Sequence, residues 1–187
     1  MIGLFQAAQK IQTFIQSNEW EFCFIGGIAL QRWGESRLTV DIDISLLTRF
    51  KNEDQYIDAL LDFLPSRVDD PKTFALQHRV LLLKTESEIG VDIALAGIPF
   101  EEEVIHRATA FQFLEHINLF TCSAEDLIIM KAFAARDIDW ADIRGILIRQ
   151  DNLDWSLILQ ELKPLVELKQ APEIVVRLEK MRKELGV

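Results

Sequence analysis

Paired aspartates in an alternating segment are the clearest chemical feature of this 187-residue sequence. Asp41 and Asp43 lie two residues apart, so a strand would place both carboxylates on one face. Val40, Ile42 and Ile44 would then anchor the opposite face in the core. Because carboxylate oxygens are the hard ligands that Mg²⁺ prefers, the pair predicts a divalent-metal site.

A third carboxylate, Asp92, lies in another apolar segment. Residues 79–85 and 91–95 have the pattern of an antiparallel hairpin, and Asp92 falls on its second strand. Asp92 would complete the protein's share of a site for two Mg²⁺ (or Mn²⁺) ions. In such a site one ion activates an attacking hydroxyl, while the other holds a triphosphate and stabilises the leaving pyrophosphate.

Two consecutive glycines, Gly26 and Gly27, separate an expected strand at 22–25 from an expected helix at 28–33. Glycine lets backbone N–H groups approach a ligand closely, and a helix N-terminus favours anions. The turn therefore predicts a phosphate-binding site just before the metal strand.

The remaining patterns predict an α/β (α+β) fold, a mixed sheet flanked by helices with a helical C-terminal region. Further helices are expected at 3–16, 52–64, 123–135, 139–148, 155–166 and 172–184. The change in pattern divides the chain into a core, residues 1–121, and a helical region packed on it, residues 122–187.

Composition narrows the class of protein. Thirty acidic against twenty basic residues give a formal net charge of -10, which disfavours a polyanionic partner unless basic residues gather locally. No apolar run reaches the length of a membrane span, and the first residues lack signal-peptide features. We expect a cytoplasmic protein whose two cysteines, Cys23 and Cys122, are reduced and buried.

The spacing of these features resembles a known signature. Gly26-Gly27, thirteen intervening residues and then Asp41-Ile42-Asp43 resemble the signature of the nucleotidyltransferase superfamily typified by DNA polymerase beta. A closer similarity, to the AbiEii-like toxins and minimal nucleotidyltransferases, rests on residues 37–43, Glu125-Asp126-Leu127, Lys131, Arg136 and residues 139–143.

The resemblance implies a reaction and a set of roles. A nucleoside monophosphate would pass from an NTP to an acceptor hydroxyl, with release of pyrophosphate. Asp41 and Asp43 would bind both ions, and Asp92 would be the third ligand and the base. The residues that would bind nucleotide or phosphate are Gly26, Gly27, Arg37, Thr39, Lys131 and Arg136.

Several alternatives stay open. The acceptor is either tRNA, as in the toxin-like relatives, or a small hydroxyl compound, and an antitoxin protein is implied only by analogy. Arg37 either orients the carboxylates or lies in a solvated loop, and Lys131 and Arg136 could form surface ion pairs. Lys72 and Lys84 compete for the lysine position that the family often has. A catalytically silent nucleotide-binding or protein-interaction module of the same fold is the alternative function.

Overall fold

The computed structural model describes residues 2–187, which form two compact units. The first unit comprises residues up to 28 and residues 38–122, and the second comprises 29–37 and 123–187. The short segment 29–37 thus belongs with the helical C-terminal part of the chain. Each unit is described separately below.

The first unit combines one sheet with helices. Its strands are β1 (Phe22–Phe24), β2 (Asp41–Leu47), β3 (Val80–Lys84), β4 (Gly90–Ala96), β5 (Thr109–Leu114) and β6 (Ile117–Thr121). Its helices are α1 (Ile2–Ser17), α3 (Glu53–Phe63), α4 (Pro71–His78) and α5 (Pro99–His106), together with the start of α2 (Gly26–Trp33).

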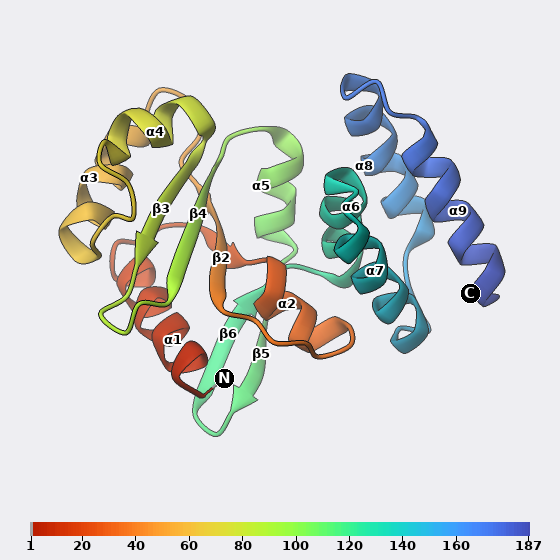
Figure 1. The fold of residues 1–187 in the computed structure, drawn as a ribbon, viewed down its shortest axis with the longest axis horizontal. Helices are drawn as coiled ribbons and strands as arrows, with labels where there is room; N and C mark the ends of the chain where they lie inside the picture. Colours follow the sequence, from red (N-terminus) through yellow and green to blue (C-terminus); the bar gives the residue numbers. More distant parts are fainter. Residues whose placement is uncertain (1) are drawn as a thin grey trace. The chain divides into compact units, whose positions relative to one another are not determined.

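The six strands form one mixed sheet in the order β3-β4-β2-β1-β6-β5 (Figure 1). Strands β2 and β4 are parallel, as are β1 and β6, and the other neighbours are antiparallel. The predicted hairpin is present as β3 and β4. The expected mixed α/β fold is therefore confirmed.

Apolar and polar residues alternate along β2 and β4, and the apolar ones form the core of this unit. Ile42, Ile44, Val91 and Ile93 are fully buried and cluster with apolar residues of α1 and α3. The prediction that Val40 joins this core is wrong, because β2 begins one residue later and Val40 is 66% exposed. The aspartates occupy the alternate positions of the two strands.

The second unit is helical. Its helices are the rest of α2, α6 (Ala124–Ala134), α7 (Asp137–Arg149), α8 (Trp155–Leu168) and α9 (Glu173–Leu185). The predicted cap of α6 is present, since the Ser123 hydroxyl accepts a hydrogen bond from the Asp126 amide at 3.0 Å. Its buried apolar side chains include Ile128, Ile143 and Leu178.

Two further expectations concern the chain as a whole. Cys23 and Cys122 are both buried, as predicted. Within residues 2–187, none of the helices combines the length and the apolar character needed to span a bilayer.

Candidate active site

The carboxylates of β2 and β4 are brought together by strand register. In the parallel pairing, Asp43 lies directly beside Asp92, and Asp41 lies beside Gly90. Register partners on adjacent strands project from the same face of a sheet, so the three aspartates share one face. The face opposite is the buried apolar one, which explains why these polar side chains stay accessible.

The first glycine of the turn is required by Asp43. Gly26 has a φ of +53°, a backbone conformation that residues with a side chain rarely adopt. The α-hydrogen that a side chain would replace points at the Asp43 carboxylate. A Cβ at this position would lie 2.0 Å from Asp43 Oδ2. The absence of a side chain therefore leaves room for the carboxylate.

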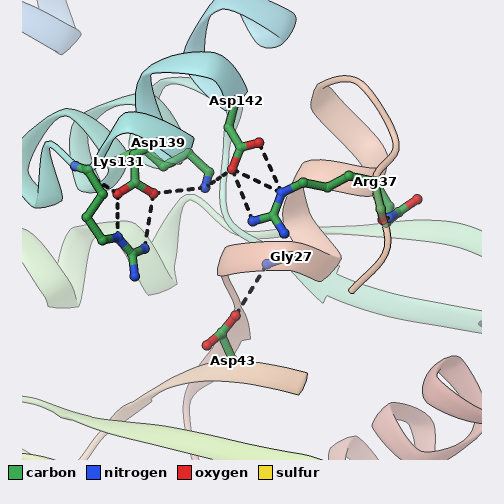
Figure 2. A network of polar contacts seen from close by, with 8 residues as sticks. Gly27, Arg37, Asp43, Lys131, Asp139 and Asp142 are labelled. Carbon is green, nitrogen blue, oxygen red and sulfur yellow. Dashed lines mark hydrogen bonds and ion pairs between the residues drawn. The ribbon is translucent and has the colours of Figure 1, made fainter. Parts of the chain in front are cut away.

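The second glycine is required by the backbone amide and by Thr39. The Gly27 N–H donates to Asp43 Oδ2 at 3.3 Å, as Figure 2 shows. A Cβ on Gly27 would lie 2.4 Å from Thr39 Cγ2. The Thr39 hydroxyl is buried and has no hydrogen-bond partner in the part of the chain that the structure describes. The turn thus positions one predicted metal ligand and covers one predicted nucleotide-binding residue.

We expect Gly26→Ala to weaken both stability and activity. The added methyl group meets the Asp43 carboxylate and sits in left-handed backbone, so unfolding should become easier by about 2 kcal/mol. Displacement of Asp43 should lower the rate of the nucleotide transfer that the motifs predict by about 100-fold. Thermal unfolding and the transfer assay measure the two effects. Gly3→Ala, where a Cβ meets nothing within 4 Å, is the matched control, and equal behaviour of both variants would contradict the assignment.

Asp92 lies in an unusual electrostatic environment. Burial raises its pKa above the ordinary value for aspartate, the guanidinium of Arg67 opposes this, and the negative charge of Asp41 adds to it. Arg67 Nη2 donates to Asp92 Oδ1 in an ion pair in which each side chain is about one-third exposed. Asp92 is therefore a half-buried carboxylate whose structural partner is a cation of the same chain.

The donor set fits a divalent metal by its chemistry. Three carboxylates on one sheet face supply hard oxygen ligands, and their crowding favours a cation. Across residues 2–187, however, no three His, Cys, Asp or Glu side chains lie close enough together to form a pre-formed metal site. Metal binding would therefore require rearrangement of these side chains, including the pairing of Asp92.

The lysines considered from the sequence are engaged elsewhere. Lys72 pairs with Asp54 and Asp58 of α3, each at 2.9 Å, and Lys84 pairs with Glu88 at 2.9 Å. The cation that contacts the predicted site is instead Arg67, which sequence reasoning missed. No local pattern marks Arg67, because its contact with Asp92 spans 25 residues.

A second polar network lies within the helical unit (Figure 2). Lys131 is buried and its ammonium donates to Asp142 Oδ2 at 2.6 Å and to Asp139 Oδ1 at 3.4 Å. Arg37 also pairs with Asp142, through Nε at 3.1 Å and Nη2 at 3.2 Å. The structure thus places Arg37 on a carboxylate other than Asp41 or Asp43.

Arg136 completes this network from the surface. Its side chain is 71% exposed, and its Nε donates to Asp139 Oδ2 at 2.6 Å. Burial alone would raise the pKa of Asp139, but hydrogen bonds from Arg136 and the charge of Lys131 hold it below the usual value. Of the two predicted basic residues, Lys131 is thus a buried ion-pair partner and Arg136 is the accessible one.

Solved structures with the same architecture define the class of fold. An antigenic nucleotidyltransferase-like protein from Paracoccidioides brasiliensis is 13% identical, with a TM-score of 0.63 over 98% of this chain and 90% of that one. The antibiotic-resistance factor ANT(2'')-Ia is 16% identical, with a TM-score of 0.55 over 96% and 97%. The lincosamide antibiotic adenylyltransferase LnuA is 13% identical, with a TM-score of 0.51 over 73% and 92%. The chain has the nucleotidyltransferase fold.

The sequence assigns the chain to one family within this fold. The model of the family described as "Nucleotidyl transferase AbiEii toxin, Type IV TA system" matches residues 16–150. The chain therefore belongs to the AbiEii nucleotidyltransferase family, which confirms the resemblance noted from its motifs. No curated protein matches the chain significantly by sequence.

Proposed function

We propose that this protein transfers a nucleoside monophosphate from an NTP to an acceptor hydroxyl and releases pyrophosphate. The observation that carries the proposal is the register of β2 and β4, which puts Asp43 beside Asp92 with Asp41 on the same face. Family membership supports the same class of enzyme. Residues 1–121 would be the catalytic core and residues 122–187 the helical region.

The three aspartates would hold two Mg²⁺ (or Mn²⁺) ions. When bound, the ions would neutralise the triphosphate and make the acceptor hydroxyl easier to deprotonate. The carboxylate of Asp92 would take the hydroxyl proton, a role suited to a carboxylate whose pKa is raised by burial. The acceptor oxygen then bonds to the α-phosphorus while the bond from that phosphorus to pyrophosphate breaks.

Other residues would bind the nucleotide. Gly26 and Gly27 begin α2, where backbone N–H groups favour phosphate, and the Thr39 hydroxyl is a donor without a protein partner in the described chain. The exposed guanidinium of Arg136 is suited to a phosphate or to the acceptor. Direct contacts of Lys131 and Arg37 with nucleotide stay predictions, since both side chains contact Asp142.

Two acceptors have specific support. The family description names a toxin of a toxin–antitoxin system, which supports an antitoxin partner, and the resemblance to toxin-like relatives implies tRNA as the acceptor. The net charge of -10 and the likeness to LnuA, solved with lincomycin bound, favour a small hydroxyl compound. We favour tRNA, because the family match rests on sequence whereas the structural likeness extends to the fold alone.

The decisive experiment incubates the protein with each α-labelled NTP, Mg²⁺ and either total tRNA or a panel of hydroxylated antibiotics. Label on tRNA together with released pyrophosphate is the expected result. Label only on an antibiotic would replace the acceptor but keep the reaction. Nucleotide binding by calorimetry without product in any arm would overturn the proposal and favour the silent module of the same fold.

A further inference from the structure

The cation that contacts Asp92 is held in place by its own backbone. Residues 65–67 run alongside β3: the Arg67 N–H donates to the Leu82 carbonyl at 3.0 Å, and the Lys84 N–H donates to the Pro65 carbonyl at 2.9 Å. Ser66 forms an isolated antiparallel bridge with Leu83. Arg67 is thus fixed at a sheet edge rather than carried on a loose loop.

The register directs this residue at the predicted metal site. Leu82, to which Arg67 is hydrogen bonded, pairs with Asp92 on β4. The guanidinium therefore crosses one strand to reach the Asp92 carboxylate. It also passes over Gly90, where a Cβ would lie 3.2 Å from Arg67 Nη1. A glycine beside Asp41 keeps this path open.

A guanidinium and a divalent ion are rival cations for the carboxylate of Asp92. Arg67 donates to Asp92 Oδ1, and its positive charge opposes a second cation bound at the same carboxylate. The cation also offsets the crowding of carboxylates on this face, which a metal would do in its place. The two cations therefore compete for one negative charge.

We propose that Arg67 is the resident counter-ion of Asp92 and competes with a divalent cation for that carboxylate. Asp92 then becomes the third metal ligand only when Arg67 releases it. This inference rests on the proposed function, since it takes Asp92 as a metal ligand. Arg67 acts through Asp92 and is a positioning residue.

The test is Mn²⁺ binding in the absence of nucleotide, measured by calorimetry on the full chain. Removal of a partly exposed ion pair should let Arg67→Gln bind Mn²⁺ about fivefold more tightly than the wild type. Arg49→Gln is the matched control, because Arg49 pairs with Glu102 and the same charge is lost. Arg49→Gln should change the affinity by less than about twofold.

Thermal unfolding gives an independent readout. In EDTA, Arg67→Gln should unfold at a lower temperature than the wild type, because Asp92 has lost its partner. Saturating Mn²⁺ should then raise the unfolding temperature by more than it does for the wild type. Arg67→Lys keeps a charge without the forked geometry, so its affinity should lie between the other two and tests the proposal even if the glutamine variant folds poorly.

The outcomes separate this inference from the proposed function. Asp43→Asn identifies the site, because it should abolish the Mn²⁺ binding in question. If such binding exists and Arg67→Gln binds equally or more weakly, Arg67 does not compete and the inference alone is overturned. If the wild type shows no Mn²⁺ binding that depends on Asp43, both the metal site and the inference fall.

Discussion

Asp43→Asn is expected to lower the rate of nucleotide transfer by about a thousandfold while leaving the protein folded. The amide keeps the size of the carboxylate and an oxygen that can accept the Gly27 N–H, so the turn should keep its geometry. What it loses is a negative charge beside Asp92. Because the site depends on charge, activity should fall while the free energy of unfolding changes by less than about 1 kcal/mol.

Steady-state transfer of label from an α-labelled NTP and chemical unfolding measure these two quantities. The matched control is Asp62→Asn, an exposed aspartate on α3, which should leave both values unchanged. An Asp43→Asn protein that retains full activity would rule out this carboxylate as a metal ligand. A loss of activity accompanied by a large fall in the free energy of unfolding would instead indicate a structural role.

The parts of the site that follow local sequence could be predicted. Alternation placed Asp41 and Asp43 on one strand face, and the glycine pair marked the start of α2. The hairpin of β3 and β4 was visible from two apolar runs separated by a turn, which located Asp92 on a strand. Each of these features depends on neighbours within a few residues.

Contacts between distant segments could not be predicted in this way. Arg67 reaches Asp92 only because residues 65–67 add to the edge of β3, and nothing near Arg67 in the sequence signals that pairing. Arg37 contacts Asp142, 105 residues away. Long side chains can adopt many directions, so their partners emerge only from the tertiary fold.

Some elements also lacked a readable pattern. Strand β5 is largely exposed on both faces, so it shows none of the alternation that a half-buried strand has. Helix α4 has only one buried residue, Ala75, and is defined mainly by the Asp70 cap and Pro71 at its start. Burial creates the periodic signal, and elements with little burial do not carry it.

Lys131→Met is expected to destabilise the helical unit by about 3 kcal/mol. Methionine retains the apolar stem of the side chain, but Asp139 and Asp142 lose the ammonium that they share within a buried site. Arg136 and Arg37 still pair with these carboxylates, so the loss should stay at the lower end for a broken buried ion pair. The role of Lys131 is then structural before any role in binding.

Urea unfolding followed by tryptophan fluorescence measures this effect, since three of the four tryptophans lie in the helical unit. Lys180→Met is the matched control: Lys180 is 76% exposed in an ion pair with Glu184, and its loss should cost less than about 0.5 kcal/mol. If Lys131→Met unfolds at the wild-type midpoint but binds NTP weakly, Lys131 is a nucleotide ligand without a structural role.

A double variant tests whether the cost of Lys131→Met arises from the unpaired charge of Asp142. In Lys131→Met combined with Asp142→Asn, the carboxylate that lies 2.6 Å from the ammonium is also neutralised. If the cost of Lys131→Met arises from unpaired charge, the double variant should be destabilised by about 1–3 kcal/mol less than the sum of the two single variants. Additive losses would mean that the cost of Lys131→Met does not arise from its ion pair with Asp142.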